Sequence, residues 1–285
     1  MQTKSYIQFK KQRELGDILT VTFKFIRENY KPLFRLIIGI VGPYFLILLA
    51  ALSYYTYSIA GSPLDAISSG FGNFLISFLI LAAALLLFYA ALYGTILHYI
   101  RSYAFNHGMV KEDEIKEGVR EDFFNLILLS IISAILIIAG LILLIIPGIY
   151  VIVPLSLASA VLVFKRYSVT ESLGYCFELI KDHWWMTFVT LLVVWLLVYI
   201  IGLVFQMPLL IYMFIKAFTM VQEGSAATPE AFTDWPFLVL NVISSLIQYL
   251  LSTITVISVA FIYFNLNEHK NLTGTFETID NLGNH

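Results

Sequence analysis

The histidines and carboxylates of this sequence are the side chains that could catalyse a reaction or hold a metal. The five histidines are scattered along the chain, at His98, His107, His183, His269 and His285. None belongs to a His-Glu-x-x-His motif, and the single cysteine, Cys176, has no histidine or cysteine at metal-binding spacing. Only His183 beside Asp182, or His98 with the acidic loop after it, could begin a site for an enzyme acting on lipids. We therefore predict no catalytic, cofactor-binding or metal site.

The acidic loop is the densest group of charges in the sequence. It contains Glu112, Asp113, Glu114, Glu117, Glu121 and Asp122, interspersed with Lys111, Lys116 and Arg120. Because acidic and basic residues are mixed along it, we expect a solvated helical face rather than a cation site. The net charge of the whole chain is −2, which provides no basic field for nucleic acid. We therefore expect no nucleic-acid partner.

The last apolar segment carries a stripe of neutral polar side chains. Asn241, Ser245, Gln248 and Ser252 follow one another at spacings of four, three and four residues, which places them on one face of a helix. Gln206 lies in the preceding apolar segment. We expect hydrogen bonds between helices, and the alternative is a polar groove for a lipid-like or neutral solute. No Asp, Glu, Lys or Arg lies within the apolar segments, which argues against ion-coupled transport.

The elements that position these side chains must lie in lipid. Of the 285 residues, 59% are hydrophobic and 13% are charged, too little polar surface for a soluble protein of this size. A hydrocarbon core of about 30 Å requires about 20 apolar residues in a helix. Six segments meet this requirement: Leu36–Tyr57, Asn73–Ile100, Phe123–Ile146, Ile149–Phe164, Met186–Ile215 and Pro236–Leu266. We predict an all-α polytopic membrane protein with six transmembrane helices and a tight turn at Pro147–Gly148.

The basic residues indicate the orientation of the chain in the membrane. Sixteen of the seventeen Lys and Arg residues fall in the two terminal segments and in the connections around residues 101–120 and 165–181. The opposite side has only Lys216, and the loop from Ser58 to Gly72 has no basic residue. Because Lys and Arg concentrate in cytoplasmic loops, we expect both termini in the cytoplasm.

Three similar segments precede the odd-numbered spans, and each reads aliphatic, basic, acidic, polar and aromatic. They are Ile26–Tyr30, Val119–Phe123 and Ile180–Trp184. Upstream of the first and the third, apolar residues recur at helical spacing, which predicts amphipathic helices with their apolar face towards acyl chains. We therefore predict one membrane domain of three parallel units, residues 13–100, 110–164 and 168–266, and a cytoplasmic tail, 267–285. The candidate contacts with lipid or a partner are Phe177, Ile180, Lys181, Trp184 and Trp185.

Residues 146–185 carry a resemblance to a known family. The stretches concerned are IPGIYVIVPLSLA (146–158), YSVTESL (167–173) and ELIKDHWW (178–185). They resemble the membrane domain of glycerophosphoryl diester phosphodiesterases and of related uncharacterised bacterial multi-span proteins. Pro154 stands where that family often has a basic residue, and Cys176 where it often has Ser. The resemblance implies a bacterial inner-membrane protein, and no soluble stretch approaches the roughly 250 residues of a catalytic barrel domain.

These observations favour a non-enzymatic inner-membrane protein, which acts as a scaffold or accessory subunit. It would engage membrane lipids or other membrane-protein subunits through its cytoplasmic interfacial helices. The alternative is a transporter or channel for a lipid-like or neutral solute, using the polar stripe of the last helix. A membrane enzyme acting on lipids is a third class, and it would require histidines or carboxylates gathered at one interface.

Overall fold

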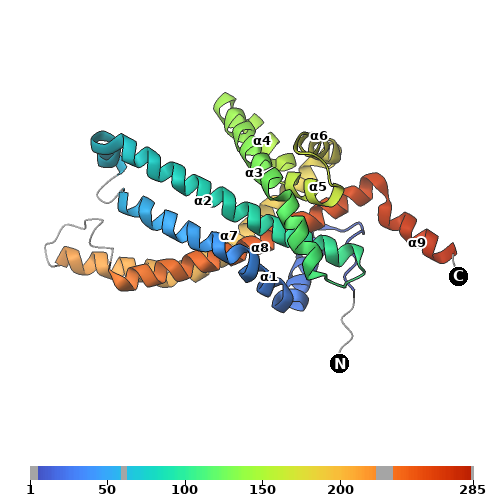
Figure 1. Cartoon of the computed structure of the whole chain (residues 1–285), viewed down its shortest axis with the longest axis horizontal. Coiled ribbons are helices and arrows are strands. Elements are labelled where there is room, and N and C mark those ends of the chain that lie inside the picture. Colours follow the sequence, from blue (N-terminus) through green and yellow to red (C-terminus); the bar gives the residue numbers. More distant parts are fainter. Residues whose placement is uncertain (1–5, 59–62, 223–233, 284–285) are drawn as a thin grey trace. The chain divides into compact units, whose positions relative to one another are not determined.

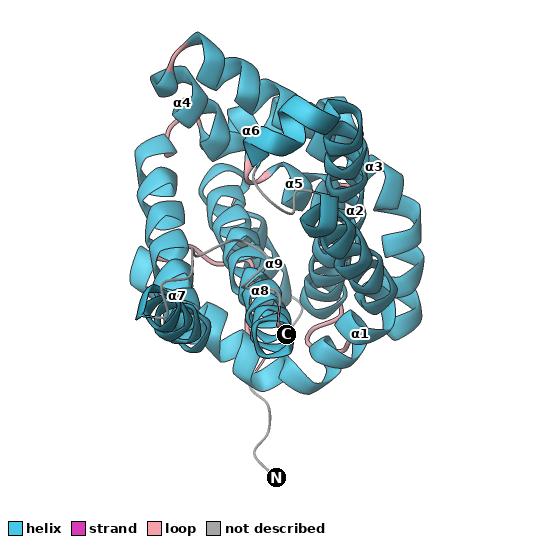
Figure 2. Ribbon diagram, turned by 90° about the vertical axis from the view of Figure 1, so that its left-hand side faces the viewer, coloured by secondary structure: helices cyan, strands magenta, loops and turns pink. Residues whose placement is uncertain are grey.

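The computed structural model describes residues 6–58, 63–222 and 234–283, and this part of the chain is helical without a strand (Figure 1). Figure 2 shows short loops between most of the helices. The helices are α1 (Leu15–Ser58), α2 (Pro63–Phe105), α3 (Glu112–Leu143), α4 (Ile145–Leu155), α5 (Ala158–Lys165), α6 (Val169–Ile180), α7 (Trp184–Gln222), α8 (Trp235–Asn271) and α9 (Thr273–Gly283). The predicted loop residues 59–62 and 223–233, and residues 1–5 and 284–285, lie outside the described residues.

Six helical segments are long and apolar enough to cross a membrane, which confirms the predicted fold class. They are Leu15–Tyr55, Phe71–Phe105, Glu112–Leu143, Ile145–Lys165, Trp184–Gln222 and Trp235–Asn271. Helices α1, α2, α7 and α8 have 37 to 44 residues and are therefore about 55 to 66 Å long. A hydrocarbon core is only about 30 Å thick, so these helices are long enough to reach the headgroup region or water.

The amphipathic helix expected before the first span is not a separate element. Helix α1 runs without a break from Leu15 to Ser58. The reason is a continuous stripe of buried side chains at helical spacing: Ile18, Thr22, Phe25, Asn29, Leu33, Leu36, Ile37 and Val41. The corresponding segment before the fifth span does end in a turn, where His183 N donates to Ile180 O at 2.9 Å. The threefold repeat itself stays a prediction.

Helices α3 and α4 form an antiparallel hairpin (Figure 1). Its reversal lies at Leu144, whose backbone is extended, and not at Pro147–Gly148 as predicted. That pair belongs to the first turns of α4, where Pro is tolerated. Gly140 of α3 and Gly148 of α4 allow the two helices to approach closely. A Cβ built on Gly140 would lie only 3.1 Å from the Cα of Gly148.

The predicted fourth span is divided into α4 and α5 after Pro154. Proline has no N–H, so it cannot donate to the carbonyl of Tyr150 four residues earlier. Trp184 Nε1 donates to this carbonyl instead, at 3.2 Å. A proline in α4 thus creates the acceptor that fixes the first residue of α7.

The chain forms two compact units, which are described separately. Unit 1 comprises residues 1–42, 89–195 and 253–285, and unit 2 comprises residues 43–88 and 196–252. The core of unit 1 includes Phe9, which precedes α1 and stacks on Phe261 with a centroid distance of 4.4 Å. In unit 2, Tyr249 contacts Phe45 and Phe88, with centroid distances of 5.5 and 4.8 Å. Each unit therefore has its own aromatic packing.

Candidate functional site

Helix α6 contains two of the predicted contact residues, but its apolar face is buried. The helix begins at a capping box, in which Glu171 N donates to Ser168 Oγ and Ser168 N donates to Glu171 Oε2. Its buried side chains are Val169, Ser172, Cys176, Leu179 and Ile180. Helix α6 packs against α3, α4 and α5, so other helices of unit 1 cover this face. The prediction that it faces acyl chains is therefore wrong.

The five predicted contact residues differ in exposure. Ile180 is 2% exposed and belongs to the core of unit 1, so it cannot contact lipid or a partner. Phe177 and Trp184 are half-buried, and Lys181 is exposed. Trp185 is 73% exposed. The accessible part of the predicted contact is therefore the turn between α6 and α7.

Four rings beside this turn form an aromatic cluster, defined here as Tyr150, Trp184, Trp185 and Phe188. Trp184 stacks on Tyr150 at a centroid distance of 5.5 Å and on Phe188 at 5.3 Å. Trp185 meets Trp184 edge-on at 4.8 Å. The hydrogen bond from Trp184 to the Tyr150 carbonyl fixes the cluster to α4. Such rings, apolar with a polar edge, are typical of the membrane interface.

The predicted polar face lies in unit 2, on α7 and α8. Ser245 Oγ donates to Asn241 Oδ1 at 3.4 Å, and Ser252 Oγ donates to a backbone carbonyl of its own helix. Gly202 of α7 lies against Gln248, because a Cβ at residue 202 would be 2.9 Å from Gln248 Oε1. Gln206 is half-buried. Gln248 thus occupies the space that the missing side chain of Gly202 leaves.

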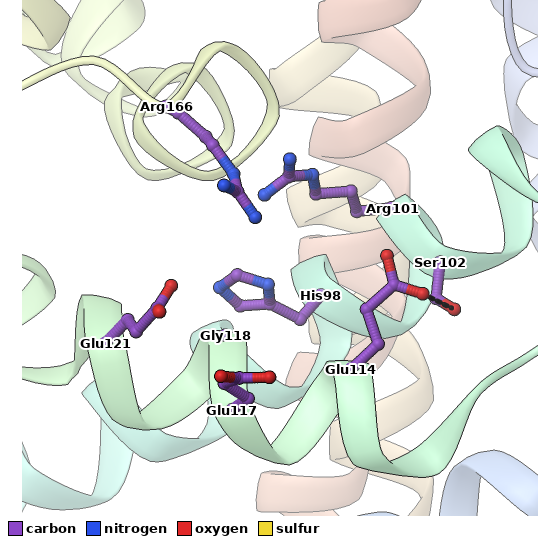
Figure 3. A pocket seen from close by; sticks show the side chains of 8 residues that line it. All are labelled: His98, Arg101, Ser102, Glu114, Glu117, Gly118, Glu121 and Arg166. Atoms are coloured by element: carbon purple, nitrogen blue, oxygen red, sulfur yellow. Dashed lines mark hydrogen bonds between the residues drawn. The ribbon is translucent and has the colours of Figure 1, made fainter.

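A charged pocket of about 250 Å³ in unit 1 brings together residues from three parts of the chain (Figure 3). We call it the arginine pocket. Its lining residues are His98, Arg101 and Ser102 of α2, Glu114, Glu117, Gly118 and Glu121 of α3, and Arg166 after α5. Helices α2 and α3 are antiparallel here, with Glu114 beside Ser102 and Gly118 beside His98. The acidic loop of the sequence is therefore the first part of α3 and forms one wall.

The imidazole of His98 lies at the centre of this pocket. It is 4% exposed, and its Nε2 lies 3.0 Å from Asp122 Oδ2. A Cβ on Gly118 would lie 2.5 Å from His98 Cε1 and closer still to Nδ1. Only glycine at position 118 therefore leaves room for the ring between the two helices.

Figure 3 shows the guanidinium groups of Arg101 and Arg166 pointing towards each other above His98. Among the described residues, neither arginine has a carboxylate within the 4.0 Å of an ion pair. Glu114 instead accepts hydrogen bonds from Ser102 Oγ at 3.3 Å and from Asn106 Nδ2 at 3.1 Å. The pocket thus offers two facing cations and three carboxylates, of which Glu114 has hydrogen-bond partners of its own.

Two of these features were indicated by the sequence and two were not. His98 with the acidic loop was named as the possible start of a lipid enzyme, and the structure does bring these groups together. Arg101 and Arg166 count in the sequence only among the basic residues that indicate orientation, because their distance along the chain gives no sign that they share a site. The only signal was that both follow the end of an apolar segment on the same predicted side.

His183 beside Asp182 is the second pair from which the sequence could begin a catalytic site. In the structure, His183 lies next to His269. The ring of His183 lies 4.8 Å from that of His269, and both line a pocket of about 260 Å³ in unit 1. Apolar side chains of Ile18, Met186 and Ile262 line the same pocket. In the described part of the chain, no group of three or more His, Cys, Asp or Glu side chains could hold a metal ion.

The cysteine of α6 is also unsuited to nucleophilic chemistry. Cys176 is fully buried, and its Sγ donates to Leu173 O at 3.0 Å. Burial raises the pKa of this thiol to about 12, because the thiolate would lose its hydration. At neutral pH the side chain is therefore a thiol that packs in the core.

Comparisons of the chain with models of protein families, with curated proteins and with solved structures find no match. The functional argument therefore rests on the residues and geometry described above.

Proposed function

We propose that this chain is a non-enzymatic multi-pass membrane protein, which acts as a scaffold or accessory subunit and engages lipids or another membrane protein through unit 1. The observation that supports this proposal is the aromatic cluster beside the α3–α4 hairpin. Trp185 is 73% exposed, and the hairpin tip, residues 142–146, is 68% to 80% exposed. Apolar surface of this extent is stable only against acyl chains or an apolar partner.

The membrane concerned, in this proposal, is the bacterial inner membrane, with both termini in the cytoplasm. The distribution of sixteen of seventeen basic residues supports this orientation. The inner-membrane location is inferred only from the resemblance noted for residues 146–185, for which the comparisons find no matching family.

The transporter alternative has less support from the geometry. A solute path along α8 would need open space beside its polar stripe. The amide oxygen of the exposed Gln248 lies against Gly202 of α7, which is the arrangement expected for packing between helices. No described observation favours movement of a solute along these residues.

A pair of matched substitutions tests the proposal. Trp185 and Trp235 are exposed to similar extents, 73% and 76%, at the first residues of α7 and α8. We expect Trp185→Ser to lose lipids or protein subunits that co-purify with the full chain from native membranes in mild detergent, and Trp235→Ser to retain them. Mass spectrometry of the purified samples measures both. Replacing Ile180 with Asp is unsuitable as a test, because it would place a carboxylate in the core.

Two results would oppose the proposal. The first is identical co-purification for wild type, Trp185→Ser and Trp235→Ser. The second is flux of a neutral solute across vesicles that contain the purified chain, abolished by Gln248→Leu, since this would favour the transporter.

A further inference from the structure

The arginine pocket combines two arginines and three glutamates, and in the described part of the chain none of the five forms an ion pair with another. Asp122, Glu114 and Glu121 act on Arg101 only at longer range. Arg101 and Arg166 face each other across about 250 Å³ of space, and neither has a carboxylate within 4.0 Å among the described residues. Two cations at close range repel each other; water weakens this repulsion at the exposed Arg166, and an anion between the two groups would turn it into attraction. Glu117 and Glu121 line the same pocket, and the structure gives them no ion pair in the described part of the chain. The pocket therefore fits a ligand with one negative and one positive group.

The backbone of Arg166 has the left-handed conformation that His107 and Leu272 also adopt at helix ends, and this conformation sets the direction in which the Arg166 side chain leaves the chain. Arg166 has a φ of +54° and a ψ of +40°, the left-handed conformation that normally favours glycine or asparagine at the end of a helix. A large side chain in this conformation is strained, and such strain is often found in ligand clamps. The arginine is therefore at a position where backbone geometry alone would select glycine, and its side chain points into the pocket (Figure 3).

The level of the pocket along its helices indicates where the ligand comes from. On α2 the apolar stretch ends at Ile100, and Arg101 follows. On α3 the last charge is Asp122, and the apolar stretch begins at Phe123. Charged side chains that directly adjoin apolar spans lie at the depth of lipid headgroups. A phospholipid headgroup is therefore available at the pocket without leaving the membrane.

From these observations we infer that the arginine pocket binds the zwitterionic headgroup of an aminoalkyl phosphodiester lipid. The phosphate lies between Arg101 and Arg166, because guanidinium groups donate paired hydrogen bonds to phosphate oxygens. The ammonium group donates to Glu117 and Glu121. His98, held by Asp122, forms the floor that separates the two charges. This inference rests on the lipid engagement proposed for unit 1 and assigns it to residues outside the aromatic cluster, so Trp185→Ser tests the cluster and Arg166→Gly tests the pocket.

Lipid binding to the purified full chain tests the inference. Native mass spectrometry would compare phosphatidylethanolamine, phosphatidylglycerol and phosphatidylcholine with the same acyl chains. We expect tightest binding of phosphatidylethanolamine, because phosphatidylglycerol has no ammonium and phosphatidylcholine has no N–H to donate. Competition with water-soluble glycerophosphoethanolamine distinguishes a membrane lipid from a free phosphodiester as the ligand. If glycerophosphoethanolamine competes and the chain shows no preference among the three lipids, the ligand is a free phosphodiester and the lipid assignment is overturned.

Substitutions then identify the pocket. Arg166→Gly removes the guanidinium while placing a favoured residue in the left-handed conformation, so a loss of binding cannot be attributed to backbone strain. We expect this variant and Arg101→Gln to weaken phosphatidylethanolamine binding about tenfold or more. Glu117→Gln with Glu121→Gln should remove the preference over phosphatidylglycerol. The control is Arg120→Gln, an exposed residue of α3 that does not line the pocket.

Two results would overturn the inference. One is equal binding of the three lipids to the wild-type chain. The other is an Arg166→Gly variant that unfolds at the same temperature as wild type or higher and binds phosphatidylethanolamine as tightly as Arg120→Gln does.

Discussion

The glycine at position 118 gives the sharpest test of the arginine pocket. Gly118→Ala would place a Cβ 2.5 Å from Cε1 of His98 and nearer still to Nδ1. His98 is 4% exposed and lies directly against α3, so the added methyl group must displace the ring from its position beside Asp122. We expect Gly118→Ala to lower the stability of the protein and to distort the pocket.

The magnitude follows from three opposing contributions. Alanine favours a helix over glycine by about 1 kcal/mol. Overpacking of a filled interior costs about 1 to 3 kcal/mol, and loss of a hydrogen bond to a charged group costs about 1.5 to 3 kcal/mol. The steric and hydrogen-bond costs outweigh the helix preference, so we expect a net destabilisation of roughly 2 to 4 kcal/mol.

The control is a second glycine of a helix in unit 1. Gly174 in α6 is exposed, and a Cβ built there meets nothing within 4 Å. Gly174→Ala should therefore stabilise the protein by up to about 1 kcal/mol. Denaturant titration of wild type and both variants in the same detergent, followed by circular dichroism, measures whether each substitution raises or lowers the free energy of unfolding. If Gly118→Ala is as stable as Gly174→Ala, the close packing of His98 against α3 is refuted.

Three further predictions concern other contacts of unit 1. Trp184→Phe should destabilise the protein by about 1 kcal/mol, because it removes the donor to the Tyr150 carbonyl. In a Pro154→Ala background the same change should cost less, since the alanine N–H can reach that carbonyl, and a double-mutant cycle without coupling would contradict this reasoning. Cys176 should react with a maleimide only after denaturation, because it is fully buried and its pKa is raised to about 12; rapid labelling of the native protein would refute its burial. Hydrogen bonds from Ser168 lower the pKa of Glu171, so its stabilisation of α6 is complete above the ordinary pKa of 4.5 and is lost as the pH falls through the lower folded value. The protection factor of the amides in the first turn of α6, that is, exchange corrected for its intrinsic pH dependence, should therefore fall in acid. Glu171→Gln should abolish this fall if the capping box is responsible.

The helical class and the apolar spans could be predicted because composition and segment length determine them directly. The prediction was wrong where a local sequence pattern fits two different environments. The apolar stripe of residues 169–180 is equally compatible with lipid and with neighbouring helices, and the structure buries it against α3, α4 and α5. The segment before the first span gave no sign of continuity, although Ile18 and Leu33 belong to one buried stripe.

The arginine pocket could be predicted only in part, because its residues are brought together by packing between helices. The acidic residues of α3 were visible as a group, since helical spacing relates them within one element. The other lining residues His98 and Arg166 come from the end of α2 and from the segment after α5. No local spacing in the sequence links these positions to α3. The burial of Phe9 against Phe261 has the same origin: a residue in a charged terminal segment gave no local signal of the core that covers it.

The location of charge along α2 and α3 connects the pocket with the membrane. A buried histidine beside a carboxylate is costly in hydrocarbon, and it is stable here because Asp122 is a hydrogen-bond partner and because charged side chains begin one turn away. Any substrate of a transport path through the spans would leave this level and meet segments without charged side chains. A headgroup bound between Arg101 and Arg166 remains at one level, where its charges are matched and its acyl chains stay in lipid. The placement of the charges therefore favours recognition at the membrane surface over passage across it.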